Sequence, residues 1–465
     1  MLWTFALLII AQKNKNFICP EIDTNTNLSK TDKVWYPYTQ MYDSSRTSTK
    51  RIIESGRDFY YIDENGQKYL DGIANMWCNV WGFDENKITS AMIDQIRKIP
   101  HSTLFGLSND KSIELSKKFL KLTKGMDKVF YTDNGSSAIE SALKMATQYW
   151  NNKGNDTKSI FLSLKSGYHG DTIGAMSVGY VDAYFRSYKK ILRPARSIPK
   201  PPICSSKGTD LQLLLEKTER IIKENSEKTI ALVMESGAQI AGGVTIYPEG
   251  YQGKIAELCR KNEVLLILDE IATGFGRLGN MIEYVAQDSI PDIACFGKAI
   301  TGGYFPFAIT TASKKIYQEF EGNWSDKKQL YHGHTYAGHP VGCTAVIENL
   351  EMYKENKLID KIRVNSKFVS KRLQEFDKFS IVKNSRNKGL LAAFDLVKKR
   401  KPITSINGIS TSMYVIKESL KRGVYLRSLG STMILIPPLA ISEQSLDKII
   451  DTQLSIIGNI EKNIF

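Results

Sequence analysis

The stretch that decides the fold is residues 264–298, VLLILDEIATGFGRLGNMIEYVAQDSIPDIACFGK. It begins with a continuous apolar run at 264–268 and ends with a second run at 293–296. Runs of this length without a polar interruption are typical of strands that are buried on both faces of a parallel sheet. Asp269 follows the first run and Lys298 closely follows the second. The stretch therefore predicts two buried strands, each with a reactive side chain beyond its carboxyl end.

Asp269 and Lys298 are 29 positions apart, which is the length of one helical crossover between neighbouring parallel strands. Parallel strands end at the same edge of a sheet, and ligands of open α/β sheets bind beyond that edge. We therefore expect the carboxylate and the amine to lie close together. Taken alone, this pair has a second interpretation as a structural salt bridge, because ion pairs are also common outside active sites.

The same alternation of short apolar runs and longer amphipathic segments extends from about residue 109 to residue 303. Further strands are predicted at 129–131, 159–164 and 230–234, and a helix is predicted from near Ser137, with apolar residues at helical spacing up to Trp150. Strands that alternate with helices predict an α/β fold with a mostly parallel sheet and helices outside it.

The bulk composition is that of a soluble globular protein with more than one subdomain: 465 residues, 42% hydrophobic and 24% charged. The formal net charge is +14, but the lysines are scattered, so we expect no nucleic-acid partner. The six cysteines are widely spaced without a CxxC pair, which is typical of a reducing compartment and predicts a cytoplasmic location. No His, Cys or carboxylate set has metal-ligand spacing, and no GxGxxG motif follows a strand, so neither a metal nor a dinucleotide is expected.

The N-terminal residues contain a short apolar segment. Residues 2–11, LWTFALLIIA, are apolar but too short to span a bilayer, and no basic residue precedes them. We therefore expect residues 1–31 to be a flexible extension and the protein to have no membrane partner.

A second group of residues points to one cofactor. Gly135 and Ser136 open the helix predicted near Ser137, and unpaired N–H groups at a helix start favour a phosphate. The alternative is a plain N-cap serine. Tyr168 is an aromatic residue that could stack on a planar ring, although core packing is its ordinary role. A phosphate cradle, a lysine, an aspartate and an aromatic plate are together what pyridoxal phosphate needs.

Two segments, LILDEIATGFGRLG (266–279) and FGKAITGGYFP (296–306), resemble the signature of the class III aminotransferases. The similarity narrows to the branch of this family that converts 8-amino-7-oxononanoate to 7,8-diaminononanoate in biotin biosynthesis. Four further segments carry this narrower resemblance: VWYPYTQM (34–41), GYHGDTIGAMSV (167–178), HGHTYAGHP (332–340) and YLRSLGSTMILIPPLA (425–440). Together they cover about residues 32–455.

The resemblance implies a fold-type I pyridoxal-phosphate-dependent transferase that forms a homodimer with shared active sites. Its large domain would span 76–345, and a smaller α+β domain would be built from 32–75 and 346–465. Lys298 would hold the cofactor as a Schiff base, Asp269 would hold its ring nitrogen, and Tyr168 would stack on the ring. Gly135 and Ser136 would hold the phosphate, together with His334 and Thr335 of the partner subunit.

The resemblance also implies a set of substrate contacts for a small keto acid and an amine donor. Arg427 would bind a substrate carboxylate, which suits its planar, bidentate guanidinium, and Tyr38 would orient the keto acid. The other residues at substrate positions are Met76, Trp77, Tyr168 and Gly333. Asp171, Glu235 and Arg277 would support the site, and the ordinary alternative for Asp171 and Arg277 is an ion pair.

Three departures from the family pattern leave questions open. Tyr36 replaces a common histidine, and Ser236 and Ile240 replace a proline and a glycine near the cofactor, which leaves the loop shape open. Met76-Trp77 stands where members that use adenosylmethionine have paired tryptophans, and an aromatic face attracts a sulfonium cation. Lysine and adenosylmethionine therefore both remain candidate donors, with the HGHTY and ITGGYFP spellings favouring lysine.

Two alternatives to this function stay open at the level of the sequence. One is a class III ω-aminotransferase acting on ornithine, 4-aminobutyrate or a diamine, against which Tyr38 and Arg427 argue. The other is a catalytically inactive binding protein on the same fold, against which the joint presence of Lys298, Asp269 and Tyr168 argues.

Overall fold

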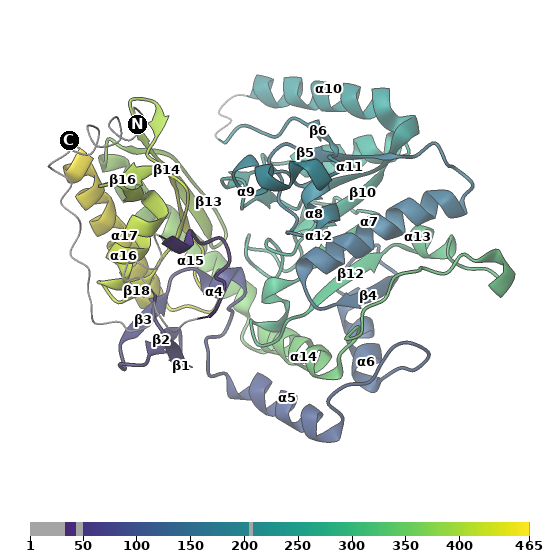
Figure 1. Ribbon diagram of the computed structural model, residues 1–465, viewed down its shortest axis with the longest axis horizontal. Helices are drawn as coiled ribbons and strands as arrows, with labels where there is room; N and C mark the ends of the chain where they lie inside the picture. Colours follow the sequence, from purple (N-terminus) through teal and green to yellow (C-terminus); the bar gives the residue numbers. More distant parts are fainter. Residues whose placement is uncertain (1–32, 43–49, 204–207, 465) are drawn as a thin grey trace, which may run out of the picture. The chain divides into compact units, whose positions relative to one another are not determined.

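The computed structural model describes residues 33–42, 50–203 and 208–464 (Figure 1). The chain divides into two compact units, one that ends at Ile52 and one that spans Ile53–Phe465. In the first unit, Tyr38 lies in a turn with a φ of 51°, and Nζ of Lys50 lies 4.0 Å from the centre of the Tyr36 ring. The expected extension, residues 1–31, lies outside the described residues.

The second unit is built around a seven-stranded sheet with the order β4-β12-β11-β10-β7-β5-β6. All neighbours pair in parallel except β12, which is antiparallel to both β11 and β4. The strands are β4 (Lys128–Thr132), β5 (Ile160–Leu164), β6 (Arg196–Ile198), β7 (Thr229–Glu235), β10 (Leu265–Asp269), β11 (Ile293–Phe296) and β12 (Ala308–Ala312). The strands predicted from the apolar runs are therefore confirmed, with ends that differ by at most one residue.

The parallel pairing of β10 with β11, in which Asp269 lies opposite Cys295, confirms that the two decisive strands are neighbours. The crossover between them is less helical than the spacing predicts. It contains only the four-residue helix α12 (Glu283–Ala286), and residues 270–282 form turns. Gly276 and Gly279 have φ angles of 89° and 96°, a region that glycine adopts without strain.

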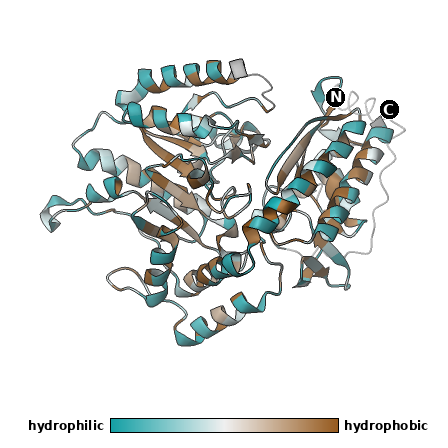
Figure 2. Ribbon diagram, turned by 180° about the vertical axis from the view of Figure 1, so that it is seen from behind, coloured by the Kyte–Doolittle hydropathy of each residue, from teal (hydrophilic) through white to brown (hydrophobic). Residues whose placement is uncertain are grey.

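Helices cover both faces of the large sheet because alternate strand residues point to opposite sides. Leu265 and Ile267 pack with α7, α8 and α13, whereas Leu266 and Leu268 pack with α6, α10, α11 and α14. These helices are α6 (Asp110–Leu120), α7 (Gly135–Asn152), α8 (Ile173–Val178), α10 (Gly208–Asn225), α11 (Tyr251–Lys261), α13 (Lys314–Gln318) and α14 (Pro340–Glu355). The outer helix surfaces are hydrophilic and the strands hydrophobic (Figure 2).

Two smaller sheets combine segments from the beginning and the end of this unit. A four-stranded sheet consists of β1 (Ile53–Arg57), β2 (Tyr60–Asp63), β3 (Lys68–Asp71) and β18 (Val424–Tyr425). A five-stranded sheet consists of β13 (Val382–Lys388), β14 (Leu391–Lys398), β15 (Lys401–Pro402), β19 (Ser428–Leu429) and β20 (Thr432–Leu435). The parallel pair β3–β18 joins the two ends of the unit.

The remaining elements connect or cover these sheets. The helices are α4 (Ala74–Trp77), α5 (Asn86–Lys98), α9 (Asp182–Phe185), α15 (Leu358–Leu373), α16 (Thr411–Leu420) and α17 (Glu443–Ile464). Two short hairpins pair β8 (Ala238–Gln239) with β9 (Thr245–Ile246) and β16 (Ser405–Ile406) with β17 (Ile409–Ser410). Short 3-10 helices occupy Arg186–Ile191, Ser226–Lys228, Lys298–Thr301, Trp324–Asp326 and Gln374–Lys378. Among the described residues, none of the helices has the length and apolarity that crossing a bilayer requires.

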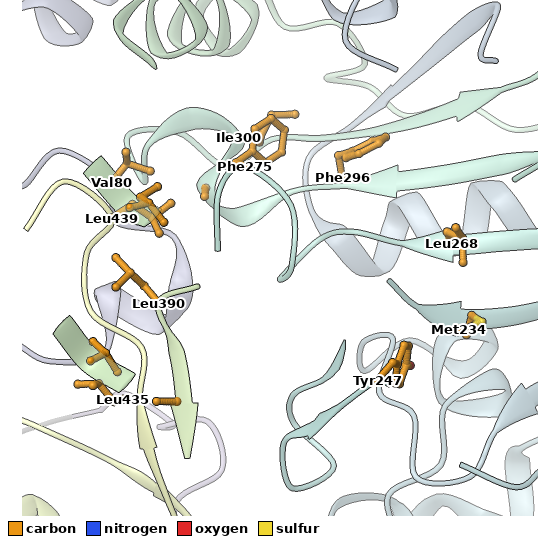
Figure 3. Close-up of a cluster of buried hydrophobic side chains, with 14 of the residues drawn as sticks. Val80, Met234, Tyr247, Leu268, Phe275, Phe296, Ile300, Leu390, Leu435 and Leu439 are labelled. Carbon is orange, nitrogen blue, oxygen red and sulfur yellow. The ribbon is translucent and has the colours of Figure 1, made fainter. Parts of the chain in front are cut away.

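One buried hydrophobic cluster extends from the large sheet to the five-stranded sheet (Figure 3). Leu268 and Phe296 contribute from the large sheet, and Leu390 and Leu435 contribute from the other side. The mixed α/β architecture with a large, mostly parallel sheet confirms the predicted fold class.

Candidate active site

A cavity lies at the carboxyl ends of the parallel strands and collects residues that follow five of them. Its lining is Trp77, Asn134, Gly135, Ser136, Tyr168, His169, Gly170, Glu235, Asp269, Ile271, Ala272, Thr273 and Lys298. The chain segments are far apart in sequence and meet here because β4, β5, β7, β10 and β11 all end at this edge. The structure thus brings Asp269, Lys298, Tyr168, Gly135 and Ser136 together, as the sequence predicts.

Lys298 is the second residue after the end of β11 and has a φ of 49°. This left-handed conformation costs free energy in a residue with a side chain. Its Nζ lies 5.3 Å from the centre of the Trp77 ring. Burial lowers the pKa of the Lys298 amine, and Asp269 opposes this effect electrostatically. A lowered pKa increases the fraction of neutral amine, which is the form that attacks a carbonyl carbon or accepts a proton. The pair is not a direct salt bridge, because none of the ion pairs of the described residues includes Lys298.

Asp269 is buried at the end of β10 and has a partner that the sequence did not assign. Its Oδ2 lies 2.8 Å from Nδ1 of His169, and its Oδ1 accepts a hydrogen bond from the Ile271 amide at 2.9 Å. Because an ionised carboxylate only accepts hydrogen bonds, the His169 Nδ1 carries a hydrogen. The histidine therefore fixes the carboxylate orientation. The adjacency of His169 to Tyr168 in the GYHGD segment was the signal that could have identified it.

Glu235 is buried beside this pair at the end of β7. It accepts hydrogen bonds from the amides of Tyr168 (3.2 Å) and Ile240 (2.9 Å). Burial raises the pKa of Glu235 to about 7, while the nearby His169 acts in the opposite direction. Glu235 thus ties the Tyr168 segment to the loop after β7, which agrees with a supporting position.

The loop that departs from the family pattern at Ser236 and Ile240 is held by its own bonds. The Ser236 hydroxyl donates to Glu270 at 3.0 Å and accepts from Gln252 at 3.0 Å. Gly237 provides the left-handed turn with a φ of 75°, and the Ile240 side chain is buried in the same cluster as Trp77. The loop is closed without the proline and the glycine.

The start of α7 forms a cradle suited to an anion. The Asn134 side chain caps the helix by accepting from the Ser137 amide at 2.9 Å, while the amides of Gly135 and Ser136 have no acceptor within the helix. A Cβ on Gly170 would lie 2.0 Å from the Ser136 hydroxyl, and a Cβ on Gly135 would lie 2.8 Å from the Ile271 side chain. These close approaches leave the helix N–H groups facing the cavity.

The cradle gives a prediction for Gly170. We expect Gly170→Ala to displace the Ser136 hydroxyl and to weaken the retention of pyridoxal phosphate by about 10- to 100-fold, because overpacking by one methyl costs about 1–3 kcal/mol. The measurement is the cofactor dissociation constant, obtained by equilibrium dialysis. Gly154→Ala is the control, since Gly154 also has a positive φ (73°) but meets no atom within 4 Å. Equal effects of both changes would refute a role for the cradle.

Tyr168 borders the cavity within an aromatic cluster. Its ring is stacked on Phe185 at a centroid distance of 5.9 Å and makes an edge contact with Tyr184 at 6.3 Å. Its hydroxyl donates to Asp171 at 3.2 Å, and the Asp171 amide donates to the Ser136 hydroxyl at 3.3 Å. Asp171 therefore links the aromatic plate to the cradle.

The segment Ala74–Trp77 is an unusual turn above this cavity. All four residues have positive φ angles (49°, 46°, 61° and 77°), so α4 is one left-handed turn. L-residues adopt this conformation at a cost of about 1–2 kcal/mol each. The turn places Trp77 against Lys298 and exposes Met76, whose Sδ lies 3.4 Å from Nη1 of Arg427. Arg427, from the segment after β18, thus lies beside the cavity through Met76.

Arg277 lies outside the cavity and is fully buried. Its Nη1 donates to the carbonyl oxygens of Leu390 (3.0 Å) and Pro437 (2.8 Å), so it joins the loop after β10 to the five-stranded sheet. The hydrogen-bond partners of this guanidinium are therefore backbone carbonyl groups. Burial lowers the pKa of Arg277 to about 10, and Asp71 is among the groups that oppose this.

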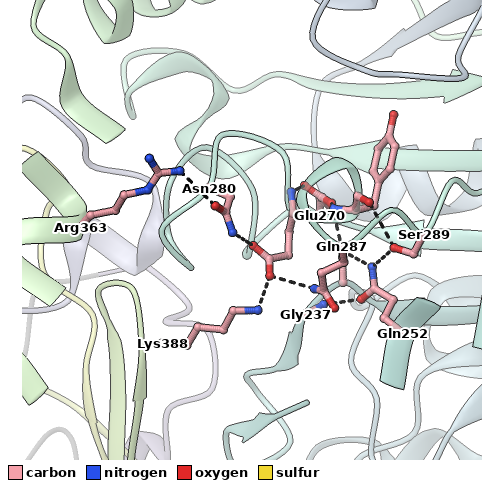
Figure 4. Close-up of polar contacts among 11 residues, drawn as sticks. Gly237, Gln252, Glu270, Asn280, Gln287, Ser289, Arg363 and Lys388 are labelled. Carbon is pink, nitrogen blue, oxygen red and sulfur yellow. Dashed lines mark hydrogen bonds and ion pairs between the residues drawn. The ribbon is translucent and has the colours of Figure 1, made fainter. Parts of the chain in front are cut away.

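A second set of polar contacts fixes the same loop (Figure 4). Glu270 accepts from the amides of Glu283 (2.9 Å) and Tyr284 (2.6 Å). Glu283 pairs with Lys388 of β13 and accepts from Asn280, which in turn accepts from Arg363 of α15 at 3.3 Å. The position of Asp269 is therefore anchored on both sides of its strand end.

Besides Tyr38, Met76, Asp171, Arg277 and Arg427, three predicted residues lie outside the cavity lining of their own chain. Gly333 packs so closely on Phe105 that a Cβ would lie 2.3 Å from its ring. His334 Nε2 lies 3.2 Å from Asp133, and Thr335 is exposed. Their roles, like that of Tyr38 in the first unit, stay predictions.

The donor set of the cavity fits pyridoxal phosphate. Besides the bare helix amides, Thr273 Oγ1 and His169 Nε2 are buried without a hydrogen-bond partner among the described residues. A carboxylate, an amine, an aromatic ring and an anion cradle surround one space, as a phosphorylated pyridine aldehyde requires. In residues 33–42, 50–203 and 208–464, no group of three or more His, Cys, Asp or Glu side chains could hold a metal ion.

Comparison with known proteins agrees with this chemistry. Residues 41–457 match the family model of the class III aminotransferases (Aminotransferase class-III). The chain belongs to the class III aminotransferase family, and it is an aminotransferase that depends on pyridoxal phosphate.

Individual relatives and solved structures show which members of this family the chain resembles. The chain is 39% identical to the adenosylmethionine-8-amino-7-oxononanoate aminotransferase of Aquifex aeolicus over 455 residues, which cover 96% of this chain and 100% of the relative. The crystal structure of the protein of that name from Methanocaldococcus jannaschii has a TM-score of 0.86 at 36% identity and covers 92% of this chain and 97% of its own. A PLP-bound amine transaminase from an uncultivated Pseudomonas species has the same TM-score at 27% identity, with coverages of 92% and 99%.

Proposed function

We propose that this aminotransferase converts 8-amino-7-oxononanoate to 7,8-diaminononanoate, a step of biotin biosynthesis. The observation that carries the proposal is the likeness to relatives of that name over nearly the whole length of both chains. The amine donor is lysine or adenosylmethionine. The single tryptophan of the Met76-Trp77 pair favours lysine, because a sulfonium cation gains from a second aromatic face.

The proposed roles follow from the geometry of the cavity. Lys298 would hold the cofactor covalently, and its amine, when free, would take up and return a proton at the reacting carbon. Asp269, oriented by His169, keeps the ring nitrogen protonated. Gly135 and Ser136 hold the phosphate, and Tyr168 covers one face of the ring. The bound cofactor supplies an electron sink for the carbon that loses its proton.

The substrate side is proposed to lie at the left-handed turn. Arg427 receives a carboxylate, Met76 and Trp77 border the chain of the substrate, and Tyr38 orients the keto acid. Asp171 and Glu235 support Tyr168 through the hydrogen bonds described above, and Arg277 supports the loop after β10.

We also propose a cytoplasmic homodimer in which Gly333, His334 and Thr335 of the partner subunit complete each site. Large exposed apolar side chains support such a face, because an apolar surface of this kind marks an interface. They belong to the segments around these residues and are Phe105, Leu107, Trp324, Tyr331 and Tyr336. The large domain (76–345) and the small domain (32–75 with 346–465) are proposed on the same basis.

A direct assay tests the function. The purified holoenzyme is mixed with 8-amino-7-oxononanoate and either lysine or adenosylmethionine, and the product is identified by mass spectrometry. We expect 7,8-diaminononanoate with one of the two donors. If neither donor gives it while ornithine, 4-aminobutyrate or a diamine is transaminated, the biotin assignment is wrong and the ω-aminotransferase alternative replaces it.

Arg427 gives a sharper prediction within this function. We expect Arg427→Lys to raise the KM for the keto acid by about 10- to 100-fold with a smaller change in kcat, because a lysine cannot form the bidentate pair and one charged hydrogen bond contributes about 1.5–3 kcal/mol. Steady-state kinetics measure both constants. Arg422→Lys, which alters an arginine bonded to Glu418 in the same region, is expected to leave KM unchanged.

A further inference from the structure

The left-handed turn Ala74–Trp77 needs an outside constraint, because four consecutive non-glycine residues with positive φ do not hold this conformation by themselves. Backbone bonds within the segment are few: Trp77 N donates to Ile73 O at 3.0 Å, and Cys78 N donates to Ala74 O at 2.8 Å. The Asn79 amide also donates to Ala74 O at 2.9 Å, and one carboxylate accepts three further hydrogen bonds from this part of the chain.

That carboxylate is Asp71, the last residue of β3, which is fully buried. Its Oδ1 accepts from the amides of Ile73 (3.1 Å) and Asn75 (3.0 Å), and its Oδ2 accepts from Nδ2 of Asn79 (3.1 Å). The Asp71 carboxylate therefore accepts hydrogen bonds from residues just before the turn, within it and just after it. All three partners are donors, which only an ionised carboxylate satisfies completely.

An asparagine at position 71 could not reproduce this grip. Its amide nitrogen would face Nδ2 of Asn79, so two donors would meet. Rotation of the Asn79 amide would not help, because its Oδ1 already accepts from the Gly82 amide at 2.9 Å. Burial raises the pKa of Asp71 to about 6, so the carboxylate remains mostly ionised at neutral pH.

Asp71 also lies in register with the strand that precedes the arginine. It pairs with Tyr425 of β18, two positions before Arg427, and the Gly72 amide donates to the Tyr425 carbonyl at 3.0 Å. Met76, which belongs to the turn that Asp71 holds, contacts Arg427 through its Sδ atom. One buried residue thus connects the carboxylate-binding arginine with the tryptophan beside Lys298.

We propose that Asp71 is a positioning residue for the substrate: its carboxylate holds the left-handed turn Ala74–Trp77, which sets Met76 against Arg427 and Trp77 against Lys298. The proposal deepens the function proposed above and depends on it for the identity of the keto acid. It predicts that loss of these hydrogen bonds weakens substrate binding and leaves the cofactor attached.

The test is Asp71→Asn in the holoenzyme. We expect the dissociation constant of 8-amino-7-oxononanoate, measured by calorimetry without donor, to rise about tenfold, which corresponds to the loss of one good hydrogen bond. The visible absorbance of the bound cofactor should persist. A residue that only contributed to stability would lower the melting temperature and leave this dissociation constant unchanged in folded protein, and that result would overturn the proposal.

Rescue by glycine separates the turn from general destabilisation. In Asp71→Asn/Ala74→Gly the turn loses one strained residue, so we expect most of the affinity to return. Asp71→Asn/Ala146→Gly is the matched control, since Ala146 is equally buried but lies in the regular helix α7. Rescue by both glycines, or by neither, contradicts the proposal.

Three further outcomes distinguish this proposal from the proposed function. If Asp71→Asn does not fold, Asn79→Ala replaces it, because this change removes one of the three hydrogen bonds. We then expect the dissociation constant of the keto acid to rise and Ala74→Gly to lower it again. If Arg427→Lys weakens binding and the Asp71 variants do not, Asp71 has no positioning role and the proposed function stands. If none of these variants affects the keto acid, the proposed substrate itself is wrong.

Discussion

Replacement of Lys298 by alanine is expected to lower kcat for transamination by at least about 10⁴-fold, because the change removes both the covalent anchor and the proton carrier. The buried, neutral-prone amine beside Trp77 is the group that both roles require. Initial rates with donor and keto acid measure the loss. The visible absorbance of the cofactor bound to the chain should disappear with it.

The control for this variant is Lys315→Ala. Lys315 is an exposed lysine of α13 that pairs with Asp292 at 3.1 Å, well away from the cavity lining. It should keep both the absorbance and the rate. A Lys298→Ala protein with wild-type absorbance and rate would eliminate Lys298 as the anchor and would return the catalytically inactive binding protein, or a different lysine, to consideration.

The second large effect is expected for Asp269→Asn, with kcat lower by about 10³-fold, since removal of one preorganised charge from a buried site costs about two to three orders of magnitude. The asparagine keeps the shape but cannot stabilise a protonated ring nitrogen. Its amide would also face Nδ1–H of His169, which now bonds to the carboxylate at 2.8 Å. Pre-steady-state rates of the donor half-reaction measure the loss at the proton-transfer step.

Glu270→Gln is the matched control for Asp269→Asn. Glu270 is the next residue, equally buried, and its carboxylate bonds to the amides of Glu283 and Tyr284 on the side away from the cavity. Its replacement should lower the melting temperature and leave the half-reaction rate nearly unchanged. A similar loss of rate in both variants would mean that Asp269 acts through loop structure and not through its charge.

The sequence alone was sufficient for the part of the site that depends on strand direction. Continuous apolar runs predicted β10 and β11, and their separation placed Asp269 and Lys298 at one edge. The phosphate cradle followed from a glycine and a serine at a helix start. These inferences succeed because periodicity and helix termini are local properties, and local properties are written in short stretches of sequence.

The parts that failed depend on contacts between distant segments. The bond of His169 to Asp269 spans 100 positions, and the carbonyl partners of Arg277 lie more than 100 positions away. Neither leaves a local pattern. The left-handed turn at Ala74–Trp77 contradicts local propensity outright, since ordinary residues there favour right-handed conformations. Hydrogen bonds to the buried Asp71, only a few positions away, override that preference.

The seven-stranded sheet divides the site into a fixed and an adjustable half. The groups proposed to meet the cofactor follow β4, β5, β10 and β11, so the number of strands between them determines their separation, at about 4.8 Å for each neighbouring pair. Met76, Trp77 and Arg427 belong to other segments and can be replaced without altering that spacing. New amine or acid specificities can therefore arise by substitution around Arg427 while the catalytic core keeps its dimensions, as the shared scaffold of relatives at 27% and 36% identity illustrates.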